Sequence, residues 1–153
     1  MKTLKQHIDE ALKIGKNLSE WSSYSCQPKT YRELEHIVND RIEKEGPNCD
    51  LNDIDTSLIT DMSELFFGSE FNGDSSKWNV SNVKNMEGMF CRSWFDDDIS
   101  DWDVSNVENM SYTFSSSKFN QDISKWKIRK DCRIHKMFDK CPIKSEYKPK
   151  LPR

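Results

Sequence analysis

The chain has 153 residues, of which 35% are apolar and 32% charged, and its 23 basic and 26 acidic side chains give a formal net charge of −3. This length suits one domain or a short repeat protein. The sequence contains no apolar run long enough for a membrane-spanning helix or a signal peptide, so we expect a cytoplasmic protein. Its five cysteines share no common spacing, which indicates reduced thiols rather than a disulfide framework.

The N-terminal third predicts two helices. Residues 1–20 place apolar side chains at helical spacing and predict an amphipathic helix. A second helix should begin at Thr30, which forms a capping box with Glu33, and should end at the Gly46-Pro47 pair. We predict that residues 1–47 form a two-helix N-terminal cap, because the exposed end of a repeat stack needs a polar cover.

The central part of the chain repeats every 24 residues. Four consecutive units cover residues 50–73, 74–97, 98–121 and 122–145, and positions one to 24 are counted below from the first residue of each unit. Periods of this length are typical of solenoids, in which each unit buries its apolar side against its neighbours. We predict a repeat domain over residues 48–145, followed by a basic C-terminal tail over residues 146–153.

Each unit distributes its apolar residues in the same way. Positions five and seven alternate a large ring with a β-branched residue, which predicts a short strand. The three-and-four spacing of positions 10, 13, 16 and 17 predicts a short helix or 3₁₀ turns. Every unit begins with an aspartate, a residue whose side chain often accepts backbone amides in turns. Position five holds Ile54, Trp78, Trp102 and Trp126, and position 17 holds Phe66, Phe90, Phe114 and Phe138.

Two phrases make the repeat specific: KWNVSNVKNMEGMF over 77–90 and DWDVSNVENMSYTF over 101–114. They resemble the BspA-like leucine-rich repeat family of bacterial surface proteins, and the resemblance spans about residues 48–145. It implies an α/β fold: a right-handed, leucine-rich-repeat-like solenoid with short parallel strands on one face and short helices or 3₁₀ turns on the other. It also implies protein or ligand binding without catalysis.

The lack of a visible secretion signal distinguishes this chain from the surface members of that family. An intracellular adaptor, or an inhibitor of a host protein encoded by a mobile element or phage, is therefore the expected function. No enzyme and no cofactor are expected, because the three histidines lie in no hydrolase or metalloprotease motif.

Metal sites are not expected either. The strongest zinc candidate combines Cys132, His135 and Cys141, but the paired C-x-x-C spacing of a zinc site is missing. The acidic run at 96–98 lacks the glycine and ligand spacing of a calcium loop. We interpret these aspartates as turn residues.

The first candidate binding surface consists of the outward positions of the predicted strands. In leucine-rich repeat folds the concave sheet is the usual binding surface, so the resemblance implies protein binding there; a merely solvated face is the alternative. The candidate residues are Asp53, Asp55, Lys77, Asn79, Asp101, Asp103, Lys125 and Lys127.

A second candidate surface, the aromatic edge, combines Phe67 and Trp94. These large apolar residues occupy positions that are polar or small in the other units. Exposed aromatic anchors dominate the energetics of many interfaces, which favours a protein-binding role for this pair. Alternatively, the predicted helix at 1–20 covers them.

Charge is distributed unevenly along the chain. Residues 48–121 hold 4 basic and 14 acidic side chains, a net −10, whereas residues 122–153 hold 11 basic and 4 acidic, a net +7. Two alternatives follow: a homo-oligomer in which acidic middle meets basic end, and polyanion binding by the last unit. Nucleic acid is the less expected ligand, because the acidic middle repels it and aromatic interleaving is missing. The polyanion-binding residues would be Arg129, Lys130, Arg133 and Lys136.

Overall fold

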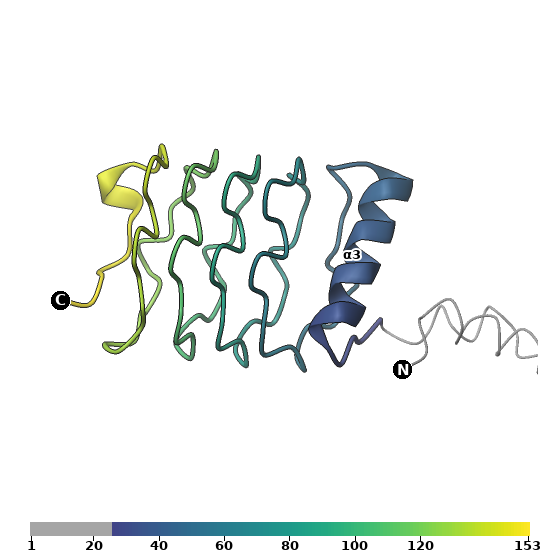
Figure 1. Ribbon diagram of the computed structural model, residues 1–153, viewed down its shortest axis with the longest axis horizontal. Coiled ribbons are helices and arrows are strands. Elements are labelled where there is room, and N and C mark those ends of the chain that lie inside the picture. The colour runs from purple at the N-terminus through teal and green to yellow at the C-terminus, as the bar shows by residue number, and fades with distance from the viewer. Residues whose placement is uncertain (1–25) are drawn as a thin grey trace, which may run out of the picture.

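The computed structural model describes residues 26–153, so the helix predicted at 1–20 lies outside the described residues. The described chain begins with helix α3, Tyr31–Glu45, and ends near a short 3₁₀ helix, η1, Ser145–Tyr147. Between them the chain winds through coils that lie side by side, with α3 at one end of the row and the C-terminal segment at the other (Figure 1).

The ends of α3 confirm the predicted second helix. The Thr30 hydroxyl accepts the amide of Glu33 at 3.2 Å, and the Glu33 carboxylate accepts the amide of Lys29 at 2.7 Å. These bonds satisfy amide groups that have no partner inside the helix. At the other end Gly46 has φ 91° and donates to the Ile42 carbonyl at 2.9 Å, which ends the helix.

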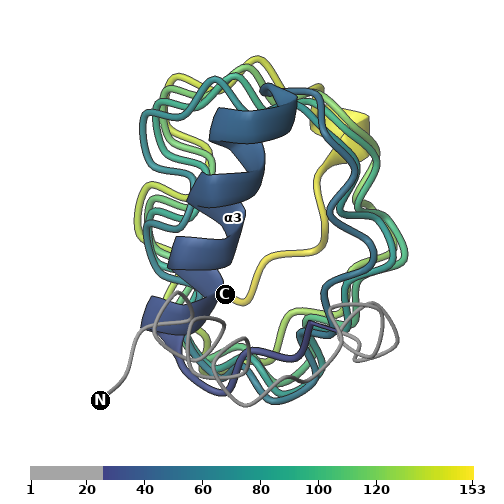
Figure 2. The ribbon, with the colours of Figure 1, turned by 90° about the vertical axis from the view of Figure 1, so that its right-hand side faces the viewer.

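Helix α3 covers the N-terminal end of the coils. Its buried face consists of Leu34, Ile37 and Val38, which join the apolar core of the repeats. Viewed along the row, the coils superimpose in one outline and α3 lies along one side of it (Figure 2). None of the helices among residues 26–153 is long and apolar enough to cross a membrane.

The predicted strands do not form, and the fold class expected from the resemblance is wrong in this respect. Over residues 26–153 the structure has no strand and no sheet, and neighbouring coils pair through isolated parallel bridges such as Asp61 with Asn85. The chain turns too often to stay extended: the amide of Trp78 donates to Ser75, and that of Val83 donates to Val80, each three residues back. These turns lie on both sides of the alternating pair that predicts a strand.

The predicted short helices do not form either. Positions 15 and 19 adopt positive φ in all four units, and a left-handed residue ends a right-handed helix. The chain therefore makes a series of tight turns between positions 13 and 20. The left-handed residues are Glu64, Gly68, Gly88, Arg92, Tyr112, Ser116, Lys136 and Lys140, with φ between 49° and 63°.

A regular set of backbone hydrogen bonds, here called the amide ladder, joins each unit to the next. The amides of positions 13, 15, 17 and 19 donate to the carbonyls of positions 12, 14, 16 and 18 in the following unit, at 2.7–2.9 Å. In the first unit the donors are Met62, Glu64, Phe66 and Gly68. Between them, the amides of positions 16 and 18 donate to carbonyls three residues back in the same unit, as Phe67 does to Glu64 at 3.0 Å.

Equivalent rings of successive units stack through the core, as the repeat predicts. The position-17 rings lie 5.4, 5.6 and 5.7 Å apart from Phe66 to Phe138, and the rings of Trp78 and Trp102 lie 6.3 Å apart. The position-five tryptophans, Trp78, Trp102 and Trp126, also donate their indole N–H to a carbonyl of the preceding unit; Trp102, for example, bonds to Ser75 at 3.1 Å. Burial and hydrogen bonding together fix the tryptophan column.

The predicted basic tail packs against the last unit. The carbonyl of Tyr147 in η1 accepts the amide of Ile123 at 3.0 Å, and Pro149 is buried. The ammonium group of Lys148 lies 5.6 Å from the ring centroid of Phe138. Residues after Ser145 therefore cover part of the C-terminal end of the row.

Candidate interaction surfaces

The outward positions four and six of the units form one candidate surface, here called the polar face. No sheet supports it, so the predicted sheet-face site is corrected to a row of turns whose side chains line up from unit to unit. Seven of its side chains are exposed and one is half-buried. The exposed residues are Asp53, Lys77, Asn79, Asp101, Asp103, Lys125 and Lys127, and the half-buried one is Asp55.

In the first three units, the position-six side chains of the polar face stabilise backbone turns. The side-chain oxygens of Asp55, Asn79 and Asp103 accept the amide two residues ahead, at 2.9, 3.0 and 3.1 Å respectively. Hydrogen bonds from the hydroxyl and amide of Ser105 lower the pKa of Asp103. These side chains hold turns, which leaves them less free to bind a partner.

Position four differs, because its side chains stabilise no turn. Within residues 26–153 the side chains of Lys77, Asp101 and Lys125 make no hydrogen bond or ion pair, whereas Asp53 pairs with Arg41 of α3 at 2.7 Å. The side chain of Lys127, at position six of the fourth unit, makes none either, so four of the eight members of the polar face are uncommitted among the described residues.

The aromatic edge combines two of the four large hydrophobic side chains that are exposed among residues 26–153. Phe67 is 48% exposed and Trp94 58% exposed. The amide of Trp94 donates to the Ser69 carbonyl of the preceding unit at 3.0 Å, which brings its backbone within two residues of Phe67. The two aromatic side chains thus lie on adjacent units, as the sequence predicts.

Arg92 is a third member of the aromatic edge that the sequence reasoning missed. Its guanidinium carbon lies 5.9 Å from the centroid of the Phe67 ring, within the range of a cation–π contact. The signal was present in the repeat, since position 19 holds glycine, serine or lysine in the other units and an arginine here breaks that pattern. Arginine and tryptophan are both enriched among the residues that dominate interfaces.

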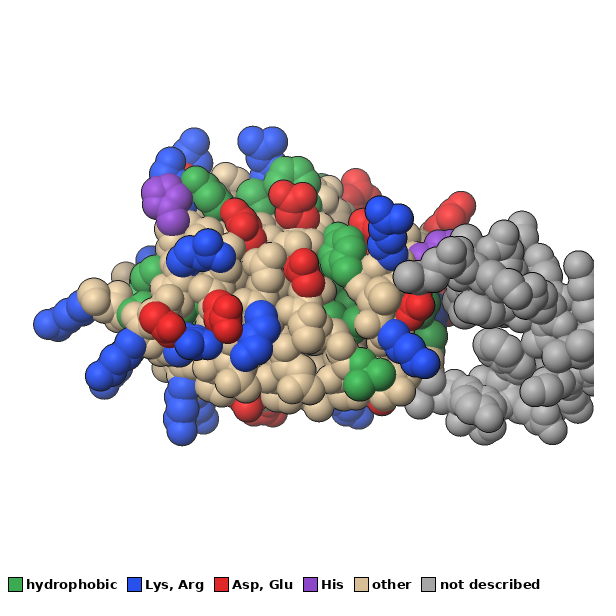
Figure 3. All heavy atoms as spheres, turned by 60° about the horizontal axis from the view of Figure 1, so that its bottom comes forward, with side chains coloured by type: hydrophobic (Ala, Val, Ile, Leu, Met, Phe, Trp, Pro, Cys, Tyr) green, Lys and Arg blue, Asp and Glu red, His purple; other side chains and the backbone are tan. Residues whose placement is uncertain are grey.

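The basic residues of the fourth unit that were predicted to bind a polyanion are only partly free to do so. On the face shown in Figure 3, lysine and arginine side chains gather toward the C-terminal end of the row. Arg129, however, is held by Asp131 at 2.6 and 2.8 Å and by Glu108 at 3.4 Å. Its partners raise the pKa of Arg129 and neutralise its charge for other ligands.

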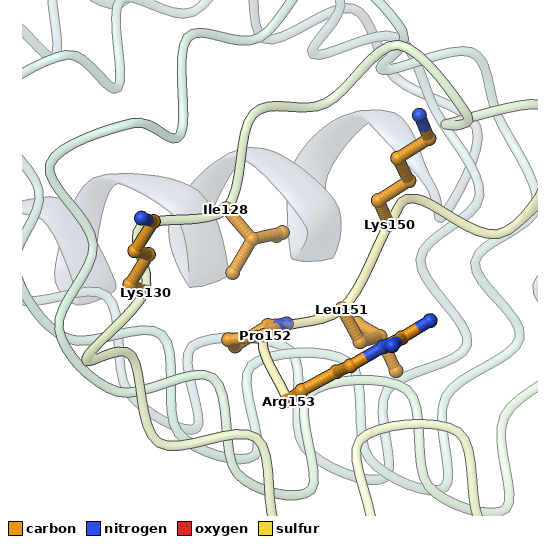
Figure 4. Close-up of a pocket in the computed structure, with 6 residues that line it drawn as sticks. All are labelled: Ile128, Lys130, Lys150, Leu151, Pro152 and Arg153. Carbon is orange, nitrogen blue, oxygen red and sulfur yellow. The ribbon is translucent and has the colours of Figure 1, made fainter.

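A hollow of about 370 Å³ lies where the C-terminal segment crosses the last unit. Ile128 faces Leu151 and Pro152 across it, whereas the charged ends of Lys130, Lys150 and Arg153 point in different directions (Figure 4). A ligand site needs a few polar groups that converge. The hollow does not provide them.

The cysteine and histidine side chains of the last unit do not come together. Cys132 is 6% exposed, although its position faces solvent in the other three units; burial raises its thiol pKa. Cys141 bonds instead to the Phe119 carbonyl at 3.2 Å, and His135 lies against Tyr112. Among residues 26–153 no three histidine, cysteine or acidic side chains are grouped to hold a metal ion.

Comparison with known proteins assigns the repeat region to a family. Neither the curated proteins nor the solved structures compared with the chain include a match. A family model described as "Mycoplasma protein of unknown function, DUF285" matches residues 33–148, from the first turn of α3 to the end of η1. Because this match covers well over half of the sequence, the chain belongs to the DUF285 family.

Proposed function

We propose that this protein is a non-catalytic protein-binding module whose principal contact is the aromatic edge of Phe67, Arg92 and Trp94. The observation that supports it is the exposure of Trp94, at 58%. The other tryptophans of the repeats, Trp78, Trp102 and Trp126, are at most 5% exposed. An exposed tryptophan two residues from an arginine is well suited to anchor a partner.

The surroundings of Trp94 suit a mixed, polar-rimmed interface. Position 21 holds Glu70 in the first unit and Lys118 in the third, so one acidic and one basic side chain flank the tryptophan along the row. Both are exposed. An apolar anchor with a charged rim is the usual anatomy of a protein–protein contact.

The repeat phrases offer independent support. Their resemblance to BspA-like repeats favours a binding role over catalysis, and this inference needs only the repeat sequence and no parallel sheet. An adaptor or an inhibitor of another protein fits such a role. Polyanion binding is less well supported, because Arg129 is already paired with Asp131 and Glu108.

Capture of partners from a mycoplasma cell extract tests the aromatic edge. Wild-type protein, Trp94→Ala and Arg92→Ala serve as baits, and the captured proteins are identified and compared by mass spectrometry. Leu58→Ala is the matched control, because Leu58 is also exposed, at 47%, and lies outside the aromatic edge. We expect the Leu58 variant to retain a partner that both edge variants lose.

A second bait separates the two candidate surfaces. Asp101→Ala removes an uncommitted charge of the polar face and should leave capture by the aromatic edge unchanged. Loss of the partner with Asp101→Ala but not with Trp94→Ala would move the binding site to the polar face. Equal capture by every variant would refute both surfaces.

A further inference from the structure

The last unit presents a row of backbone amides without acceptors. In the first three units the position 13, 15, 17 and 19 amides all donate to the next unit through the amide ladder. Within residues 26–153 the equivalent amides of the fourth unit donate to no backbone or side-chain acceptor. These four amides, here called the open edge, belong to Ile134, Lys136, Phe138 and Lys140.

The apolar side chains of the open edge are also incompletely covered. Ile134 and Phe138 are half-buried, whereas their counterparts Met110 and Phe114 are fully buried. Phe138 stacks on Phe114 at 5.7 Å on one side, and a lysine ammonium group lies over its ring. The aromatic column therefore ends in a half-buried ring, on which an apolar side chain would pack in place of the Lys148 ammonium group.

Positive charge surrounds this edge. Residues 132–144 contain four basic side chains and one acidic one, Asp139. The basic residues are Arg133, Lys136, Lys140 and Lys144, all of them exposed. A segment that docks here should therefore be acidic, because opposite charge speeds association and favours the correct partner.

A second copy of the chain is poorly suited to fill the open edge. The matching carbonyl row belongs to the first unit, and α3 lies over that end (Figure 2). Arg41 of α3 donates to the Asp50 carbonyl at 3.2 Å and to the Asp53 carboxylate at 2.7 Å, which fixes the helix to the first unit. Pairing of the two rows would require α3 to move away.

We propose that the open edge binds an acidic, extended segment of another protein, whose alternate carbonyls accept the four amides and whose apolar side chain packs on Phe138. Addition of a chain segment to unpaired backbone groups is a recurrent mode of peptide recognition. The open edge lies in the fourth unit and the aromatic edge in the first two, so each proposal can fail without the other.

Amide hydrogen exchange tests whether the edge is open in the free, full-length protein. The amides of Ile134, Lys136 and Phe138 should exchange much faster than those of Met110, Tyr112 and Phe114, which occupy the same positions one unit earlier. The difference should reach about a hundredfold or more, because ladder amides exchange only after local opening. Equal protection of both sets would overturn the proposal.

Peptide binding tests the occupant. The probe is a synthetic peptide that copies residues 58–73, which carries Asp61, Glu64 and Glu70, has no basic residue and presents the ladder carbonyls of a unit in register. Its addition should slow exchange at the four edge amides. A control peptide with lysine at those three acidic positions should bind at least about tenfold more weakly; equal binding of both peptides would contradict an acidic partner.

Protein variants complete the test. The double variant Lys136→Glu, Lys140→Glu should weaken binding of the acidic peptide by about tenfold or more, whereas Lys118→Glu, an exposed charge of the third unit, should not. Trp94→Ala should also leave peptide binding unchanged, which separates this edge from the proposed function. Tight duplex DNA binding that displaces the peptide without protecting the amides would identify a polyanion surface and overturn the peptide proposal.

Discussion

At the scale of single residues, neighbouring aspartates of the polar face do different work. Asp103 accepts the amide and hydroxyl of Ser105 at 3.1 and 2.6 Å, whereas Asp101 bonds to nothing among the described residues. Asp103→Ala should therefore lower the free energy of unfolding by about 1 kcal/mol, the usual worth of such a bond. Asp101→Ala should change it by less than about 0.5 kcal/mol.

Urea denaturation followed by circular dichroism measures both changes. Asn79 provides an internal reference, because it holds the equivalent turn of the second unit with an uncharged amide. Asp103→Asn should accordingly retain the stability of the wild type at neutral pH. Equal losses in the two alanine variants would contradict the distinction between turn-holding and uncommitted side chains.

The same turns predict a loss of stability in acid. Hydrogen bonds, chiefly from side chains at the turns, lower the pKa of four aspartates below the ordinary value of 3.8: Asp55, Asp74, Asp103 and Asp122. A carboxylate with a depressed folded-state pKa stabilises the fold above its unfolded value and loses that contribution as pH falls through the folded value. Asp97, whose pKa is raised by burial, opposes this trend.

We therefore expect the urea midpoint to be steady down to about pH 5 and to fall as the pH passes 3.8 and below. Asp103→Asn should reduce this acid sensitivity, because the amide holds the turn without titrating. A midpoint that rises between pH 5 and pH 3 would mean that Asp97 outweighs the four turn aspartates.

At the scale of elements, the repeat pattern predicted which side chains are buried better than it predicted the backbone conformation. Trp102, Phe90 and Met86 are buried as expected, yet neither the strand nor the helix forms. Apolar spacing reports which side chains point inward, and a chain of tight turns produces that spacing as readily as a strand or helix. Left-handed residues such as Tyr112 and Lys136 decide the backbone path, and non-glycine residues at these positions gave no clear signal in the sequence.

For the candidate sites too, the sequence predicted side-chain exposure better than it predicted what depends on the backbone. Exposure of Phe67 and Trp94 could be predicted because they interrupt a repeated pattern. Arg92 interrupts the repeat at position 19 in the same way, but its place in the aromatic edge follows from its guanidinium over Phe67. The open edge consists of backbone amides, so its free donors depend on which neighbour is present and not on side-chain identity.

Two tryptophans illustrate the difference between a core position and a surface position. Trp102 is 4% exposed, stacks on Trp78 and donates to Ser75, whereas Trp94 is 58% exposed. Trp102→Ala should lower the free energy of unfolding by about 3–5 kcal/mol through the cavity it leaves. Trp94→Ala should change it by less than about 0.5 kcal/mol, and denaturation of the two variants side by side checks both values.

At the scale of the whole molecule, the two ends of the row are unequal. The N-terminal end presents carbonyls of an acidic unit and is covered by α3, whereas the C-terminal end presents amides of a basic unit. Uncovered ends of this kind would be complementary and would join head to tail without closing. We therefore predict that helix α3, by covering one of the two ends, keeps copies of the chain from assembling.

Removal of α3 should make the protein self-associate. A variant that begins at Pro47 exposes the carbonyl row of the first unit, and its mass in sedimentation experiments should rise with protein concentration while the full chain stays unchanged. Higher salt should weaken the assembly, because the first unit is acidic and the last is basic. The added changes Lys136→Glu and Lys140→Glu should suppress it, and a truncated protein that remains folded and monomeric would show that α3 has no such protective role.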